Sequence, residues 1–318
     1  MTFTTARPFT RAEALAAKIS VKELAGPEYR RIFHGIYLDR RVPLDIRHRA
    51  MAALHIAPPG SYASHHTAAQ LWGGVAPATT DTHLSAPTPL TRSIRRGIVA
   101  HRIQFDAAPR SRHGILVSSP EQTFLELASA RVGLIDLVVL GDSLVRRELT
   151  TPEKLIKAAA DWTGRGSRVA RRAARFVRTG VDSPMETRVR LLIVLAGFPE
   201  PVVNLIIRYP DGSWRWRFEI CYPAYMVIIE YDGRHHADDP GQWNADILRR
   251  EELERAGWRS VVVTARAFYT EPAAVLARIS ETLGSRGADL PRRKVPAEWA
   301  RLFPGRAATA VESSTGGR

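Results

Sequence analysis

One short stretch, residues 217–236, constrains this 318-residue chain most, because its sequence RFEICYPAYMVIIEYDGRHH combines strand-like runs with clustered acidic side chains. The runs at 214–221 and 225–231 read as strands, and the tyrosine and proline between them favour a turn. Side chains alternate between the two faces of a strand, so Glu230 and Asp232 point the same way. We therefore expect a hairpin with acidic side chains on one face.

A third carboxylate is expected to join this pair. On the first run, Arg217, Glu219 and Cys221 share one face, and a hairpin would place Glu219 beside Glu230 and Asp232. Like charges repel and raise each other's pKa values, so three close carboxylates are costly without a compensating cation. A hard divalent ion, Mg²⁺ or Mn²⁺, is the usual solution.

Gly233 follows the second run and permits a sharp turn. Such a turn would bring His235 and His236 to the edge that carries the carboxylates. A histidine near a metal-bound carboxylate cluster is typical of a metal-dependent nuclease. The alternative is that the Asp232-Gly233 pair is only a turn and that the acidic side chains are ordinary surface residues.

The balance of charge points to a polyanionic partner. The chain has 46 Lys and Arg against 32 Asp and Glu, which gives a formal net charge of +14. Nucleic acid is the commonest partner for such a surplus, although a general compositional bias toward arginine is the alternative. With 45% hydrophobic and 25% charged residues the chain has an ordinary globular composition. Its single cysteine, Cys221, excludes an intrachain disulfide and a cysteine-rich zinc site.

Nothing in the sequence indicates a membrane protein. The longest apolar runs, such as 191–197 and 226–229, are far too short to cross a bilayer. The start, MTFTTARPFTRAEAL, lacks the apolar segment of a signal peptide. We therefore expect a cytoplasmic protein with DNA as its partner and no membrane partner.

The N-terminal region, 1–42, is predicted to be a small winged-helix-like unit. Thr10 and Glu13 form a capping-box pattern at the start of a helix, a second helix start follows at 20–25, and Gly35 interrupts a strand in YRRIFHGIYLDRR. Residues 9–38 resemble the N-terminal region of AbiEi-type antitoxin proteins. That resemblance implies a DNA-binding winged helix.

Residues 43–165 are predicted to form an accessory α/β module with helices near 43–55 and 61–71 and strands near 80–85, 97–103 and 115–118. His65 and His66 are adjacent, so helical geometry would turn them in different directions. They are interpreted as capping or packing residues rather than metal ligands.

Residues 166–181 are predicted to be a basic helix that links the module to the C-terminal domain. Arg168, Arg171, Arg172 and Arg175 fall at i, i+3, i+4 and i+7, so four guanidinium groups would line one helix face. Such a stripe suits a phosphate backbone, because arginine binds phosphate bidentately. The alternative is a solvated face that keeps the protein soluble.

Residues 182–284 are predicted to form an α/β domain, a mixed sheet flanked by helices. Ser183, Pro184 and Glu186 give an N-cap, an N1 proline and a capping-box glutamate at its first helix. The expected order is helix, three strands, helix, strand and helix. Residues 285–318 lose this periodicity and are expected to form a flexible basic tail with one turn of helix at 297–302.

The C-terminal domain resembles an uncharacterised domain family related to the very-short-patch-repair (Vsr) endonucleases, within the PD-(D/E)XK superfamily. The matching positions are Ser183 to Glu186, Glu230-Tyr231-Asp232-Gly233, His236, Asp246, Arg249, Leu253 and Gly257-Trp258. The resemblance implies that Glu219, Glu230 and Asp232 hold Mg²⁺ and that His236 lies near the attacking water or the scissile phosphate. It also implies that Glu186 orients the site and that Arg249 contacts DNA.

The sequence therefore predicts a metal-dependent DNA endonuclease that hydrolyses phosphodiester bonds, linked to DNA repair, phage defence or a toxin–antitoxin system. One departure supports a second interpretation: the family usually has aspartate where this chain has Glu219. On that interpretation the protein is a catalytically inactive DNA-binding regulator or antitoxin of AbiEi type. A third is a protein that binds a cognate toxin or a repair partner.

Overall fold

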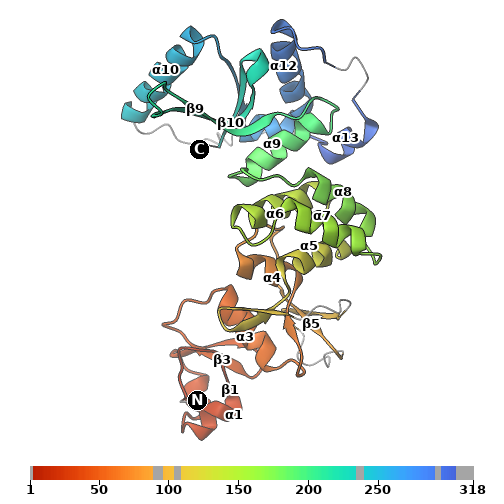
Figure 1. The fold of residues 1–318 in the computed structure, drawn as a ribbon. Helices are drawn as coiled ribbons and strands as arrows, with labels where there is room; N and C mark the ends of the chain where they lie inside the picture. Colours follow the sequence, from red (N-terminus) through yellow and green to blue (C-terminus); the bar gives the residue numbers. More distant parts are fainter. Residues whose placement is uncertain (1–2, 89–95, 104–108, 234–239, 291–294, 306–318) are drawn as a thin grey trace, which may run out of the picture. The chain divides into compact units, whose positions relative to one another are not determined.

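The computed structural model describes residues 3–88, 96–103, 109–233, 240–290 and 295–305, and the chain divides into two compact units, 1–179 and 180–318 (Figure 1). The described residues form three β-sheets and surrounding helices, which confirms the predicted α/β class. Two of the three sheets mix parallel and antiparallel pairs.

The first unit begins with a small antiparallel sheet of strand order β1-β3-β2. Its elements are β1 (Phe9–Thr10), α1 (Arg11–Ala16), α2 (Val21–Leu24), β2 (Tyr29–Phe33) and β3 (Ile36–Asp39). Both predicted helix starts are confirmed, because Thr10 and Ser20 each form a complete capping box. Gly35 turns the β2–β3 hairpin with a φ of 75°, which only glycine adopts readily. Phe9, Ala14 and Leu24 form the core beneath this sheet.

The second sheet of this unit has five strands in the order β6-β5-β4-β8-β7. Its elements, with two helices that pack on it, are α3 (Ile46–His55), β4 (Tyr62–Ala63), α4 (His65–Trp72), β5 (Thr82–Ala86), β6 (Ile98–Arg102), β7 (Arg110–Arg112) and β8 (Ile115–Val117). Strand β7 was not predicted, because its sequence, RSR, is polar and has no apolar alternation. Among the described strands it lies at the edge of the sheet, paired with β8.

Four helices complete the first unit: α5 (Pro120–Ser129), α6 (Leu134–Arg146), α7 (Pro152–Asp161) and α8 (Ser167–Phe176). Helix α8 packs against α5, α6 and α7. Its buried face consists of Ala170, Ala173 and Ala174, which recur at helical spacing between the arginines. The segment expected to be a linker is therefore part of the packed first unit, because small apolar residues line one side of the same helix.

The second unit contains a four-stranded mixed sheet in the order β12-β11-β10-β9. Its strands, with a short 3₁₀ helix, are β9 (Val202–Arg208), β10 (Trp214–Tyr222), η2 (Pro223–Tyr225), β11 (Val227–Asp232) and β12 (Arg259–Thr264). Antiparallel pairing joins β9 to β10 and β10 to β11, whereas β11 and β12 are parallel. The predicted hairpin is confirmed, and the parallel pair follows from the helix that connects its strands.

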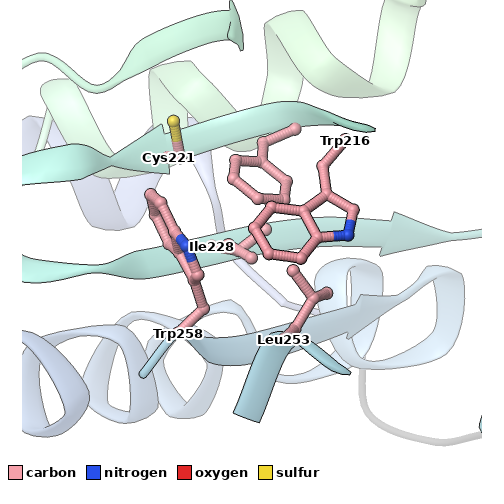
Figure 2. Close-up of a cluster of buried hydrophobic side chains, with 6 residues drawn as sticks. Trp216, Cys221, Ile228, Leu253 and Trp258 are labelled. Carbon is pink, nitrogen blue, oxygen red and sulfur yellow. The ribbon is translucent and has the colours of Figure 1, made fainter. Parts of the chain in front are cut away.

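The helices of this unit are α9 (Pro184–Val194), α10 (Pro240–Arg255), α11 (Ala265–Thr270), α12 (Pro272–Ser285) and α13 (Ala297–Leu302). The predicted order of helices and strands is confirmed apart from α11, a short helix capped by Thr264 that the sequence did not single out. Figure 2 shows Trp216, Ile228, Leu253 and Trp258 gathered in one buried cluster. Since these residues come from β10, β11, α10 and the position just before β12, the cluster fixes the hairpin to the rest of the unit.

The region expected to be a flexible tail contains a packed helix. Trp299 in α13 is buried and donates its indole Nε1–H to the carbonyl oxygen of Leu192 at 2.7 Å, and Phe303 is buried beside it. The sequence predicted the helical turn itself but not its attachment, which depends on a residue 107 positions away. None of the helices in the described part of the chain combines the length and apolar character that a membrane span requires.

Candidate active site

The β10–β11 hairpin brings two of the predicted carboxylates together. The register pairs Ile220 with Ile229, so Glu219 and Glu230 are the next residues at that end of the ladder. The carboxylate of Glu219 accepts a hydrogen bond from the backbone N–H of Tyr231 at 3.3 Å. Asp232 lies two residues beyond Glu230 and ends the strand. The predicted grouping of these side chains at one end of the hairpin is therefore found.

Glu186 reaches the same place from the start of α9. Ser183 caps this helix, with its hydroxyl accepting the N–H of Glu186 at 3.1 Å. The Glu186 side chain is buried, and its Oε2 accepts the backbone N–H of Asp182 and the Nδ2–H of Asn204, each at 3.0 Å. These donors fix the carboxylate in one position. Glu186 is thus a buried acid, held in one orientation at the start of α9.

The pKa of Glu219 is shifted by its burial and by the charged groups around it. Burial raises the pKa of Glu219, the N–H of Tyr231 lowers it, and the negative charges of Glu186 and Glu230 raise it again. The guanidinium of Arg249 acts in the lowering direction. The net shift of the Glu219 pKa is upward, so its carboxylate ionises less readily than a free glutamate.

Arginine side chains surround the acids. Arg249 places Nη2 2.8 Å from Oε1 of Glu230 and donates to the carbonyl oxygen of Arg217 at 3.3 Å. Arg217 in turn donates from Nε to Oδ1 of Asn204 at 2.9 Å and forms an ion pair with Asp182. Arg249, which was predicted to contact DNA, thus binds a carboxylate of the site in this structure.

The network of Asp182, Asn204 and Arg217 was not predicted as part of the site. For Arg217 a signal existed, because its place on the strand puts it on the face of Glu219. For Asn204 no sequence pattern indicated a place in the site. It lies on β9 with a φ of 49°, a backbone conformation that the sequence does not predict.

These acidic side chains line a cleft of about 750 Å³ along β10. We call it the acidic cleft, and it is lined by Glu186, Glu219, Glu230 and Asp232 together with arginine and tryptophan side chains. A cleft with both carboxylates and guanidinium groups can take a cation and the phosphates of a polyanion side by side.

The candidate metal ligands are not arranged as a finished metal site. Within the described ranges no group of three or more His, Cys, Asp or Glu side chains is placed to hold a metal ion. Oε2 of Glu219 accepts a hydrogen bond from the N–H of Tyr231, and Oε1 of Glu230 accepts one from Arg249. His236, the predicted group near the water or phosphate, lies outside the described residues, as does His235. The donor set is nevertheless of the kind that a hard cation prefers, since it consists of close carboxylates whose mutual repulsion a cation would relieve.

The arginine stripe of α8 divides in two. Arg168 and Arg175 are exposed, whereas Arg171 donates to the carbonyl oxygens of Ala159 at 3.2 Å and Trp162 at 2.8 Å. Arg171 therefore caps the end of α7, and Arg172 is half-buried. Two of the four predicted phosphate-binding arginines, Arg168 and Arg175, are thus exposed to solvent.

A second cluster of ionisable groups lies in the first unit, and we call it the histidine cluster: His65, His66, His83 and His101. The rings of His65 and His101 stack with centroids 3.5 Å apart, and Nδ1 of His83 lies 3.0 Å from Nε2 of His101. His65 and His66 both lie against the ring of His83, so the expectation that adjacent histidines must diverge is wrong here. The reason is that His65 starts the helix with a φ of 51° rather than a helical value. Its interpretation as a packing residue is confirmed, since it is buried.

Beside this cluster, burial raises the pKa of Glu126 to about 7. The carboxyl group accepts hydrogen bonds from the N–H of His65, the hydroxyl of Ser118 and the amide of Gln122, at 2.8 to 2.9 Å. Burial also lowers the pKa values of His83 and His101 to about 4. The sequence analysis singled out His65 and His66 but not His83 and His101, which lie on β5 and β6 and join them only through the packing of the sheet.

Comparison with known proteins adds relatives without assigned roles. The chain is 27% identical over 255 residues to an uncharacterized protein of Mycobacterium tuberculosis strain CDC 1551 / Oshkosh, a match that covers 80% of this chain and 92% of that protein. An uncharacterized protein of strain ATCC 25618 / H37Rv matches with the same identity and coverage. No protein-family model matches the chain, and no solved structure matches it significantly.

Proposed function

We propose that this protein is a metal-dependent DNA endonuclease whose reaction takes place in the acidic cleft. The observation that carries the proposal is the meeting of Glu186, Glu219 and Glu230 at one end of a strand hairpin, in a cleft that also holds arginines. The sequence resemblance of residues 182–284 to a Vsr-related domain supports the proposal, and this unit has the mixed sheet flanked by helices that the α/β prediction required. The net charge of +14 supports a polyanionic substrate.

Glu219, Glu230 and Asp232 would hold Mg²⁺ or Mn²⁺. When bound, such an ion lowers the pKa of a coordinated water and offsets the charge that develops on the phosphate oxygens. Glu186, held by Asn204 and the N–H of Asp182, keeps the Glu219 side of the site in place.

The remaining roles belong to cations and to the histidine that the sequence singled out. Arg217 lies beside the acids and is positioned to contact a phosphate of the substrate. Arg249 would move from Glu230 to a phosphate when a metal ion takes its place. His236, in its neutral form, would accept the proton of the attacking water, since the ordinary pKa of histidine lies near neutral pH.

One observation favours a second candidate, a catalytically inactive DNA-binding regulator of AbiEi type. The ion pair between Arg249 and Glu230, at 2.8 Å, satisfies a carboxylate that a nuclease would use for its metal. Glu219 also stands where the resembled family has aspartate, which is one methylene shorter. On this reading the first unit binds DNA through its small N-terminal sheet and helices, and the second unit serves as a scaffold or binds a toxin or repair partner.

Nicking of supercoiled plasmid in Mg²⁺ or Mn²⁺ tests the proposal. Glu230→Gln should reduce nicking at least about 100-fold, because it removes a charge that holds the metal. Glu251→Gln is the matched control: Glu251 lies on the same helix as Arg249 but outside the cleft and pairs with Arg255 in solvent, so its change should leave the rate within about threefold.

Two results would contradict the endonuclease. Equal nicking by wild type and Glu230→Gln would show that the cleft is not the catalytic site. Tight DNA binding with neither cleavage nor Mn²⁺ binding by calorimetry would favour the regulator.

A further inference from the structure

Trp214 is the feature of the acidic cleft that the proposed reaction leaves unused. Its side chain is 59% exposed, whereas Trp216 and Trp258 in the same unit are about 5% exposed. It lines the cleft at the start of β10. Among the residues that the structure describes, its indole makes no ring stacking, cation–π contact or hydrogen bond. An exposed indole at the edge of a polar cleft offers its flat face to a ring of a ligand.

The backbone beneath Trp214 is held firmly in place. In the turn before it, Tyr209 N–H donates to the carbonyl oxygen of Ser213 at 2.9 Å, and Gly212 adopts a φ of 83°. Asp211 accepts the N–H and the hydroxyl of Ser213 at 2.8 and 2.6 Å. The indole is therefore presented by a structured hairpin end, which reduces the entropy lost when a ligand binds.

Cationic side chains follow the same strand. The guanidinium of Arg215 lies 3.7 Å from the ring centroid of Trp216 and 5.0 Å from that of Tyr209, and Nη2 lies 3.3 Å from Glu252. These contacts hold its position. From Arg215 the cleft continues to Arg217 and then to the acids, so an aromatic platform, arginines and carboxylates succeed one another along β10.

We propose that Trp214 stacks on an unpaired DNA base, so that the substrate is DNA with a single-stranded segment lying along β10. This inference rests on the proposed endonuclease function. The path from Trp214 to Glu219 covers five residues of strand, about 16 Å, which is the length of a few nucleotides. Bases inside a duplex are already stacked on each other, whereas an unpaired base offers its face to an aromatic ring. Arginines along the way would contact the intervening phosphates.

Binding to an oligonucleotide with a 3′ single-stranded extension, carrying 2-aminopurine in the extension, tests this inference. The full chain is titrated in EDTA, so that no cleavage occurs. Binding should quench 2-aminopurine fluorescence, and Trp214→Ala should remove most of the quenching and weaken binding about 5- to 150-fold, the range for stacking of one base. Trp214→Phe should keep part of both effects. On a blunt duplex, Trp214→Ala should change affinity less than about twofold.

Tyr269→Ala is the matched control, because Tyr269 is an aromatic residue of the same unit that is 44% exposed and does not line the cleft. It should bind like the wild type. Quenching and affinity unchanged by Trp214→Ala, or equal losses on blunt duplex and extended DNA, would overturn the inference. Plasmid nicking separates the two proposals. If the wild type nicks plasmid but Trp214→Ala leaves quenching and affinity unchanged, the endonuclease is supported and the base-stacking site is refuted. If quenching depends on Trp214 but no plasmid is nicked, the base-stacking site is supported and the endonuclease is refuted.

Discussion

The acidic cleft of the second unit and the histidine cluster of the first unit both place ionisable side chains close together, and they differ in how the electrostatic cost is met. In the acidic cleft, Glu230 and Glu219 remain part-exposed and take hydrogen bonds from Arg249 and from the N–H of Tyr231. In the histidine cluster, His83 is buried and its pKa is low, so the rings stack as neutral groups.

The difference shows that proximity of ionisable residues does not by itself define a reactive site. Burial without counter-charges favours neutral forms, which pack and stabilise the fold. Partial exposure beside arginine side chains favours charged carboxylates, which a site for cations and phosphates requires. A substitution beside the histidine cluster, a change of pH and a substitution in the acidic cleft each test this difference.

The largest effect is expected for Glu126→Ala. The substitution leaves the donors of His65, Ser118 and Gln122 buried without an acceptor, which should lower the free energy of unfolding by about 3 kcal/mol. Glu219→Ala should change it by less than about 1 kcal/mol, because the loss of one hydrogen bond is offset by relief of repulsion from Glu186 and Glu230. Calorimetric unfolding of both variants measures this. Similar losses for the two would show that the clusters play equal structural roles.

The next effect is the loss of folding stability at acidic pH. Below pH 6.5 the unfolded chain protonates His83 and His101, whereas the folded protein does so only near pH 4, so stability falls as the pH drops through this window. Burial lowers the pKa values of His65 and His66 too, which adds to the fall. Glu126 opposes it, because its folded pKa near 7 means that stability is gained between pH 7 and 4.5.

The net loss between pH 6.5 and pH 5 should be about 3 kcal/mol, because the histidines together lose more than Glu126 gains. Glu126→Gln, which removes the opposing group while keeping a hydrogen-bond acceptor, should make the fall steeper. Thermal unfolding of both proteins at a series of pH values gives the slopes. A stability that rises from pH 6.5 to pH 5 in Glu126→Gln would refute the neutral histidine cluster.

The smallest effect is expected for Arg249→Met. The ion pair with Glu230 is part-exposed, with 42% of the arginine and 25% of the glutamate side chain accessible, so its loss should cost less than about 1 kcal/mol of unfolding free energy. Because Arg249 then no longer competes for Glu230, Mn²⁺ should bind a few-fold more tightly. Calorimetric titration with Mn²⁺ measures the second effect. Weaker Mn²⁺ binding would mean that Arg249 supports the cation site rather than competing with it.

Much of the fold and part of the site followed from local patterns. The caps at Thr10 and Ser183, the hairpin of β10 and β11 and the strand that carries both Glu230 and Asp232 were all predicted and found. Only interactions between residues close together in the sequence are needed for each of them. The metal ligation, the role of His236 and the kinship to Vsr-related domains stay predictions.

The tertiary structure decided which distant groups meet. Asn204 holds Glu186 across 18 residues, Arg249 reaches Glu230 across 19, and Glu126 receives the N–H of His65 across 61. These meetings depend on sheet register and helix packing, which the apolar core selects as a whole and which no short segment encodes. The sequence by itself determined which acids share a strand face; only the packed fold determined that they lie with arginines in a cleft while the histidines are buried and neutral.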